Sequence, residues 1–229
     1  MTLARRRVLK FAMASTALAT LSACGAGNMG GMAGGLMGGG GGKSWGEIAK
    51  SFKNLMNQAV AGVAETQESI AMLADALGLK QEAATLRGEA KNIREKGTSF
   101  AASDLDESVN VTNDGLGRIS DKLAQAKTLN AGEKQKIGEA MANYAPAALK
   151  VGLAAVDAAL AISDASSAGT PTPADGMEII GLAKDIPTKG PAIVKFAKLS
   201  IQGFKDLRAI ANENDIAVPA TDELDALSI

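Results

Sequence analysis

Few side chains in this sequence of 229 residues could take part in catalysis or metal binding. The residue types that are missing restrict the possible kinds of site more than the types that are present. The chain has no histidine and a single cysteine, Cys24. Histidine-activated serine or cysteine nucleophiles and histidine-ligated zinc or haem are therefore excluded. One cysteine also excludes an internal disulfide, a thiolate zinc site and an iron–sulfur cluster. We therefore expect no enzymatic activity, no catalytic residue, no metal site and no cofactor.

One set of oxygen-bearing side chains resembles the start of a calcium-binding loop. Its members alternate along the chain: Asp104, Asp106, Ser108 and Asn110. Such a loop needs a glycine at its sixth position and a glutamate at its twelfth, and Val109 and Gly115 stand there instead. The pattern therefore favours the start of a helix capped by Ser103 or Asp104.

Two further sets also have competing interpretations. Asp222, Glu223 and Asp225 could supply a paired acid and base, and they fit equally the first turn of a helix after Thr221. Three methionines, Met29, Met32 and Met37, could bind copper through their thioethers. Their irregular spacing and the lack of a second soft ligand favour methionines that lie against lipid or in solvent.

Lys150 and Asp157 interrupt an apolar run over residues 140–162, and a spacing of seven places them on nearly the same helical face. A buried lysine there could act as a nucleophile or in a gating pair, whereas a lysine on the solvated edge of a bundle is the commoner arrangement. The run could also insert into a membrane, at the cost of two charges in its centre. Similarly, Trp45 and Phe52 could touch lipid headgroups or pack at the end of a bundle.

Residues 1–23 have the three parts of a secretory signal peptide: a basic start, an acid-free apolar stretch and small residues before Cys24. The apolar stretch is too short for a comfortable membrane span. The tetrapeptide Leu21-Ser22-Ala23-Cys24 resembles the lipobox of bacterial lipoproteins. The resemblance implies cleavage between Ala23 and Cys24, diacylglycerol on the Cys24 sulfur and often a further acyl chain on the new amino terminus. Two or three acyl chains anchor a protein stably in a membrane, whereas a single chain binds weakly and reversibly.

The basic start resembles the twin-arginine export motif, through Arg5 and Arg6, then any residue, then Val8, Leu9 and Lys10. That resemblance implies export of an already folded protein. Ala4 departs from the serine or threonine that usually precedes the arginines. The alternative is a plain basic segment that the general secretion machinery recognises.

The rest of the chain divides into a tether at 24–43 and a helical domain at 44–229. The tether is rich in glycine and methionine and has no charge before Lys43, so we expect it to be disordered, with a reach of about 24 Å. Ser44 and Glu47 predict a capping box at the first helix, and Asn130 and Glu133 predict another. Apolar residues at steps of three and four predict helices over 44–77, 80–96, about 103–126, 130–166, 174–184 and 192–213, with a docked turn after residue 219.

These elements predict an all-α fold, because no segment alternates with the period of a strand for more than a few residues. Short connections make sequential helices antiparallel neighbours, so we expect an elongated antiparallel bundle of about five helices. Inward positions include Thr66 on the first helix, Ala155 and Ala159 on the fourth and Ser200 on the last. Pro146 should kink or split the fourth helix, and Pro187, Gly190 and Pro191 should break the chain between 184 and 192.

The charge of the chain and its lipobox-like segment together predict the function. Four of the 24 basic residues lie within residues 1–23, which leaves 20 against 25 acidic ones and no basic surface for nucleic acid. We expect a non-enzymatic cell-envelope lipoprotein, a helical scaffold or protein-binding module held on the membrane through Cys24. The alternatives are a membrane-active bundle resembling α-helical pore-forming toxins and, lowest, a small-ligand-binding bundle. Gly25 does not resemble the aspartate signal of inner-membrane retention, so a host with two membranes would carry the protein on the periplasmic face of its outer membrane.

Overall fold

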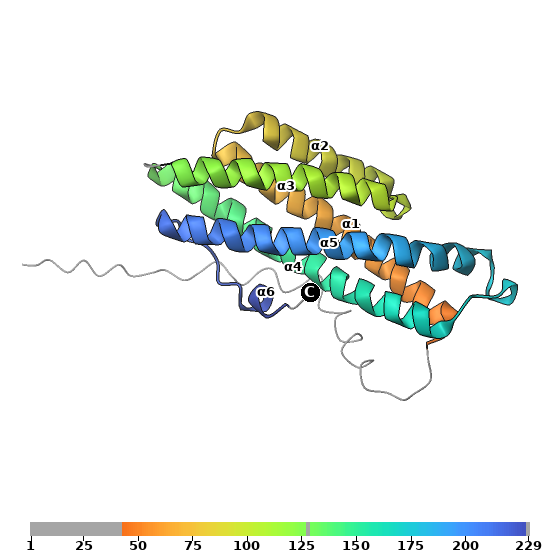
Figure 1. Ribbon diagram of the computed structural model, residues 1–229. Coiled ribbons are helices and arrows are strands. Elements are labelled where there is room, and N and C mark those ends of the chain that lie inside the picture. Colours follow the sequence, from red (N-terminus) through yellow and green to blue (C-terminus); the bar gives the residue numbers. More distant parts are fainter. Residues whose placement is uncertain (1–42, 127–128, 228–229) are drawn as a thin grey trace, which may run out of the picture. The chain divides into compact units, whose positions relative to one another are not determined.

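The computed structural model describes residues 43–126 and 129–227, and every regular element within those ranges is helical (Figure 1). This confirms the all-α prediction. The elements are α1 (Trp45–Ala76), α2 (Lys80–Lys96), the short turn η2 (Gly97–Ser99), α3 (Ala102–Gln125), α4 (Ala131–Ala168), the turn η3 (Pro173–Asp175), α5 (Met177–Glu213) and α6 (Asp222–Ala226).

Local signals set most of the helix ends. The Ser44 side chain accepts from the backbone N–H of Glu47, while the Glu47 carboxylate accepts from that of Ser44 at 2.9 Å. Asn130 and Glu133 form the same reciprocal pair at the start of α4, at 3.0 Å and 2.8 Å. Each pair satisfies two backbone donors that the first helical turn leaves free. Gly97 ends α2 with a positive φ of 53°.

The long helices pack side by side, and α1 contacts each of α2, α3, α4 and α5. The direction of α4 follows from two ion pairs, since Lys43 meets Asp164 and Glu65 meets Lys150. Later positions on α1 therefore meet earlier positions on α4, and the two helices are antiparallel. The pairs Glu68–Arg94 and Asp75–Arg87 show the same for α1 and α2.

The place of α3 differs from the prediction that sequential helices are neighbours. It packs against α5 and not chiefly against α4, which follows it in the chain (Figure 1). Asp106 meets Lys195, and Leu116 lies against Gly203, so α3 and α5 run in the same direction. The bundle is therefore antiparallel between α1 and α2, α2 and α3, α1 and α4, and α4 and α5, and parallel between α3 and α5.

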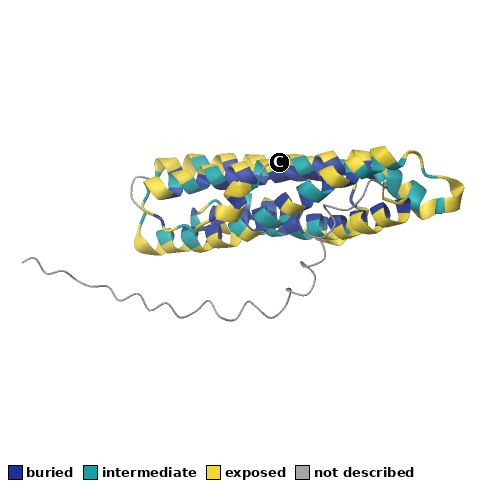
Figure 2. Ribbon diagram, turned by 90° about the horizontal axis from the view of Figure 1, so that it is seen from below, coloured by how far each residue is buried: buried dark blue, intermediate teal, exposed yellow. Residues whose placement is uncertain are grey.

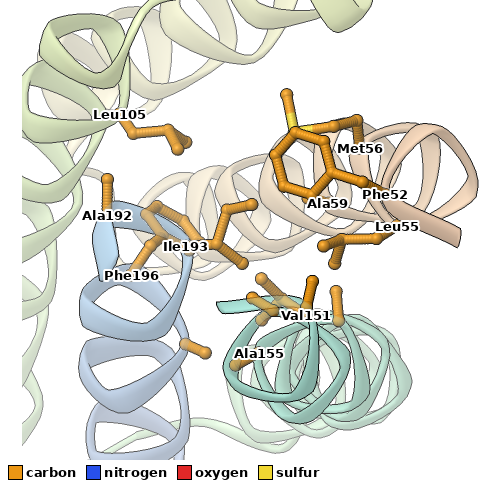
Figure 3. Close-up of a cluster of buried hydrophobic side chains, with 14 of the residues drawn as sticks. Phe52, Leu55, Met56, Ala59, Leu105, Val151, Ala155, Ala192, Ile193 and Phe196 are labelled. Carbon is orange, nitrogen blue, oxygen red and sulfur yellow. The ribbon is translucent and has the colours of Figure 1, made fainter. Parts of the chain in front are cut away.

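Two apolar clusters form the core, one toward each end of the bundle. The first joins α1, α3, α4 and α5 around Phe52, Leu105, Val151 and Phe196 (Figure 3). The second is built around Ile70, Leu86, Tyr144 and Phe204, and the ring of Tyr144 meets that of Phe204 edge to face at 5.4 Å. Buried residues face the interior along the helices, and exposed residues face outward (Figure 2). Trp45 and Phe52 both belong to the core, so packing at the bundle end is the interpretation that holds for them.

The predicted break between residues 184 and 192 is wrong, because α5 runs without interruption through Pro187 and Pro191. Both prolines are exposed and four residues apart, so they lie on one outward face of the helix. The opposite face remains buried through Ile186, Gly190 and Ile193. Tertiary packing of that inner face holds the helix together, while the missing proline N–H groups lie toward solvent.

Three smaller expectations also change. The N-cap of α3 is Ala101 and not Ser103 or Asp104, and Asp104 reaches back to the backbone N–H of Ala101 at 2.7 Å. Of the two effects expected of Pro146, a kink or a split, the split does not occur, because α4 continues through this residue. Ala159, expected to face inward, is exposed, because the buried face of α4 follows Ala155, Ala158 and Ala161 instead.

Candidate functional site

The predicted lipidation, cleavage and export residues lie outside the described residues. These are Cys24, Ala23, Arg5, Arg6, Val8, Leu9 and Lys10, and the three tether methionines Met29, Met32 and Met37 lie there too. The first described residue is Lys43, and its ammonium group contacts the Asp164 carboxylate at 2.8 Å. Asp164 belongs to the last part of α4, so the chain joins the bundle beside that end of α4.

The side chains of the calcium-like set do not converge. Asp104 bonds to the Lys96 ammonium at 2.8 Å, Asp106 to that of Lys195 at 2.8 Å, and Ser108 donates to the Glu89 carboxylate at 2.6 Å. The Lys96 ammonium, together with the Ala101 N–H, holds the pKa of Asp104 below its usual range. These three members each bond to a different residue of a neighbouring helix, and Asn110 is exposed. Within the described ranges no group of three or more histidine, cysteine, aspartate or glutamate side chains is placed to hold a metal ion.

Of the carboxylates near the end of the chain, Asp225 helps to dock α6. Asp222, Glu223 and Asp225 lie in its first turn. The Arg208 guanidinium donates two hydrogen bonds to Asp225, at 2.9 Å and 3.0 Å, and holds the pKa of that carboxyl below its usual range. Leu224, between them, is buried in the second cluster. The helix-start interpretation therefore accounts for all three carboxylates.

A layer of buried polar side chains separates the two apolar clusters, and the sequence pattern predicted only part of it. Thr66 and Ser200, expected to face inward, bring their hydroxyl oxygens to 3.5 Å of each other. Gln67 donates to the Thr112 hydroxyl at 3.4 Å, and its own amide oxygen is buried without a hydrogen-bond partner among the described residues. Polar residues at core positions of a bundle fix which helical turns face each other. The layer therefore specifies the alignment of α1, α3 and α5.

Two small open grooves lie between the N-terminal parts of α1 and α5. One has a volume of about 220 Å³ and is lined by residues that include Phe52, Asn57, Thr98 and Lys189. The buried Lys189 ammonium is held by Asp185 at 2.9 Å and lies 5.5 Å from the centre of the Phe100 ring. The second groove has a volume of about 250 Å³. Both are smaller than the pockets of about 300–1,000 Å³ that enclose small-molecule ligands.

The outer face of α4 carries Lys150 and Asp157. The Lys150 side chain is 42% exposed and bonds to the two Glu65 carboxylate oxygens at 2.7 Å and 2.6 Å, which is the solvated-edge arrangement. Asp157 is half-buried and forms no ion pair with a described residue. Burial raises the pKa of Asp157, and the nearby Lys43 ammonium lowers it in part. The structure does not bring Lys150 and Asp157 of one chain together.

Large apolar side chains are exposed on the same face of α4, and the sequence pattern did not predict them. Leu153 is 42% exposed and Leu160 is 39% exposed. Helix α4 is also the described helix whose length and apolar composition would allow a membrane span, although a core helix of a soluble bundle passes the same test. The outer face of α4 therefore carries two exposed leucines beside Lys150 and Asp157.

Comparison with known proteins places the chain in no group. No family model, no curated protein and no solved structure matches it.

Proposed function

We propose that this protein is a non-enzymatic cell-envelope lipoprotein, a helical scaffold or protein-binding module held on the membrane through acyl chains on Cys24. The observation that carries the proposal is the position of Cys24. The only cysteine of the chain ends a lipobox-like tetrapeptide directly after a signal-like apolar stretch. In a host with two membranes, the expected location is the periplasmic face of the outer membrane.

The described part of the chain supports a binding role through its surface. Its interior is filled by apolar side chains and a hydrogen-bonded polar layer, and its grooves are shallow. The Lys43–Asp164 contact lies 19 residues after Cys24, so the tether predicted from the sequence would leave the bundle free to meet a partner near the membrane.

The test is fractionation of tagged wild type and Cys24→Ala from the native host, followed by crosslinking and mass spectrometry of the membrane fraction. We expect wild type in membranes, Cys24→Ala displaced from them, and one envelope neighbour that recurs in the crosslinks. Ser22→Gly is the matched control, because it keeps a small residue in the lipobox and should fractionate like wild type. Equal fractionation of wild type and Cys24→Ala would contradict the proposal.

The export route has its own test. Replacing both Arg5 and Arg6 by lysine should block export through the twin-arginine route, while Arg7→Lys, at the position of the motif that accepts any residue, should leave export unchanged. Normal export of the double variant would assign the signal to the general secretion machinery and would leave the lipoprotein proposal standing.

A membrane-active protein is the second candidate, and the length and apolar composition of α4 favour it. Its test is leakage of a dye from lipid vesicles on addition of the protein. Leakage that Leu153→Glu abolishes would support this candidate. Intact vesicles at concentrations at which the protein binds them would contradict it.

A further inference from the structure

Helix α4 presents a row of apolar side chains outward. The row follows steps of four and three residues, which keeps it on one side of the helix: Ala142, Pro146, Leu149, Leu153, Val156 and Leu160. Leu149 and Val156 are half-buried, and the other four are exposed. The row extends for about 27 Å at the 1.5 Å rise of a helix. Helix α6 contacts α4, and Leu227, directly after α6, lies against Gly152 on the side of α4 that meets Ile201 of α5. Among the described residues, Leu153 and Leu160 of the row stay exposed.

Two opposite charges flank the middle of this row. Lys150 precedes Leu153 by three residues, and Asp157 follows it by four. At 100° per residue both lie on the same side of the row, about 40–60° from Leu153. Lys150 is partly exposed beside Glu65, and Asp157 has no ion pair within the described ranges.

We propose that the outer face of α4 binds the same face of a second copy of this chain, with the two α4 helices antiparallel and related by a two-fold axis at Leu153. The two-fold rotation leaves a residue on the same side of the row. It also moves a residue that precedes Leu153 to the corresponding position beyond Leu153 of the other copy. Lys150 of one copy therefore comes opposite Asp157 of the other, with an offset of about 1.5 Å along the axis. The same pair forms twice, as a two-fold interface requires.

Charge complementarity favours a second copy over a lipid surface. Asp157, which has no ion pair within the described ranges, gains an opposite charge in the dimer, where the Lys150 ammonium of the other copy lies between it and Glu65. Against acyl chains Asp157 would stay without an ion-pair partner. The flanking positions also include acids, Asp157 and Asp164, and lack the lysine and arginine cluster that attracts a helix to anionic headgroups. The apolar row adds contact area along the seam, and Leu153 meets its own equivalent at the axis.

The surface lies wholly within the described bundle. The inference rests on the proposed function in one respect, which is that membrane anchoring brings two copies close together. Two chains anchored through Cys24 would share one membrane plane, which raises the effective concentration of each for the other. An interface of this modest length would then form on the membrane more readily than in dilute solution.

The first experiment uses the symmetry of the proposed interface. Leu153→Cys in the full chain should form a disulfide-linked dimer on mild oxidation of native membranes, because residue 153 meets its own copy at the two-fold axis. Lys91→Cys, on the exposed side of α2, is the matched control and should stay monomeric. An equal dimer yield from both variants, or none from Leu153→Cys, would overturn the proposal.

The parent chain without an added cysteine separates this proposal from the proposed function. A free thiol on Cys24 would contradict lipidation, and the Leu153→Cys test would then be read in a Cys24→Ala background. If Leu153→Cys stays monomeric and is instead captured by a photoreactive lipid, the face contacts the membrane and the dimer is wrong.

A charge exchange tests the pairing itself. Both variants are made in the Leu153→Cys chain. Asp157→Lys alone places two lysines, at 150 and 157, opposite each other in both cross-axis pairs. Lys150→Glu alone places two acidic residues opposite each other in both pairs. Each alone should lower the dimer yield about tenfold, the effect of about 1.4 kcal/mol of repulsion. Co-expressed with tags of different size, the two variants should recover the yield as a mixed dimer, because both of its cross-axis pairs join opposite charges. Failure of the mixture to recover, with both variants folded by circular dichroism, would overturn the proposed geometry.

Discussion

Gly62 of α1 lies directly against the backbone of Val151 of α4. A Cβ atom at residue 62 would lie 3.1 Å from the Val151 nitrogen and 3.2 Å from its Cα, closer than ordinary van der Waals contact. The close approach of α1 and α4 therefore depends on a residue without a side chain, at a helical position where alanine would otherwise be preferred.

Gly62→Ala should lower the free energy of unfolding by about 1–3 kcal/mol, because backbone atoms cannot move aside as a flexible side chain can. Gly117→Ala is the matched control, since nothing lies within 4 Å of a Cβ placed at that exposed position in α3. It should raise the free energy of unfolding by about 0.5–1 kcal/mol through helix propensity alone. Urea unfolding of both variants measures the difference, and a stabilised Gly62→Ala would show that α1 and α4 are less closely packed.

Tyr144 should make the bundle sensitive to alkali. Its hydroxyl donates to the Ser200 carbonyl at 2.8 Å, and complete burial raises the pKa of Tyr144 above that of a free phenol. Because the folded state favours the neutral phenol, stability is full below about pH 10 and falls as the pH rises above that value.

Tyr144→Phe should remove that alkaline loss and, at neutral pH, cost about 1 kcal/mol for the hydrogen bond. Tyr144 is the only tyrosine of the chain, so ultraviolet absorbance follows its ionisation without interference. Ionisation of Tyr144 in the folded protein at about pH 10 would contradict its burial.

Asp157 should reduce the stability of the isolated bundle at neutral pH. Burial raises the pKa of this carboxyl, so the stabilising protonated form is present below about pH 4 and is lost as the pH rises through the folded-state pKa. Asp157→Asn should therefore raise the melting temperature at neutral pH and have little effect in acid. The measurement is thermal unfolding of the monomeric protein in dilute solution, with Asp114→Asn on the exposed side of α3 as the control. Destabilisation by Asp157→Asn would assign the carboxylate a favourable contact within the single chain.

The two prolines of α5 should weaken a helix that packing holds together. Pro187→Ala and Pro191→Ala each restore a backbone donor on the exposed face, so each should raise the free energy of unfolding by about 1–3 kcal/mol. Circular dichroism and urea unfolding test this, and Thr188→Ala is a neighbouring exposed control that leaves the backbone donors unchanged. A loss of stability in both proline variants would mean that their restricted φ angles matter more than the missing donors.

Local patterns predicted most of the helices because their causes are local. The pairs Ser44–Glu47 and Asn130–Glu133 act within one turn, and the three and four residue steps of apolar side chains set the buried faces of α1 and α2. Local patterns also predict the signal peptide, the lipobox and the export motif, because the export and processing machinery recognises such segments by their linear sequence. The absence of histidine and the single cysteine narrowed the possible chemistry before any fold was known.

What the sequence by itself determined is therefore the helical class, the capped ends of α1 and α4 and the limits on chemistry. Only the tertiary structure decided that α5 continues through Pro187 and Pro191, that α3 lies beside α5, and that Leu153 and Leu160 face outward. Each of these depends on contacts between residues far apart in the chain. In α5, burial of Ile186 and Ile193 offsets the free-energy cost of the hydrogen bonds lost at the prolines. The alanine-rich run of α4 has no strong apolar stripe of its own, so packing against neighbouring helices determines which side is buried.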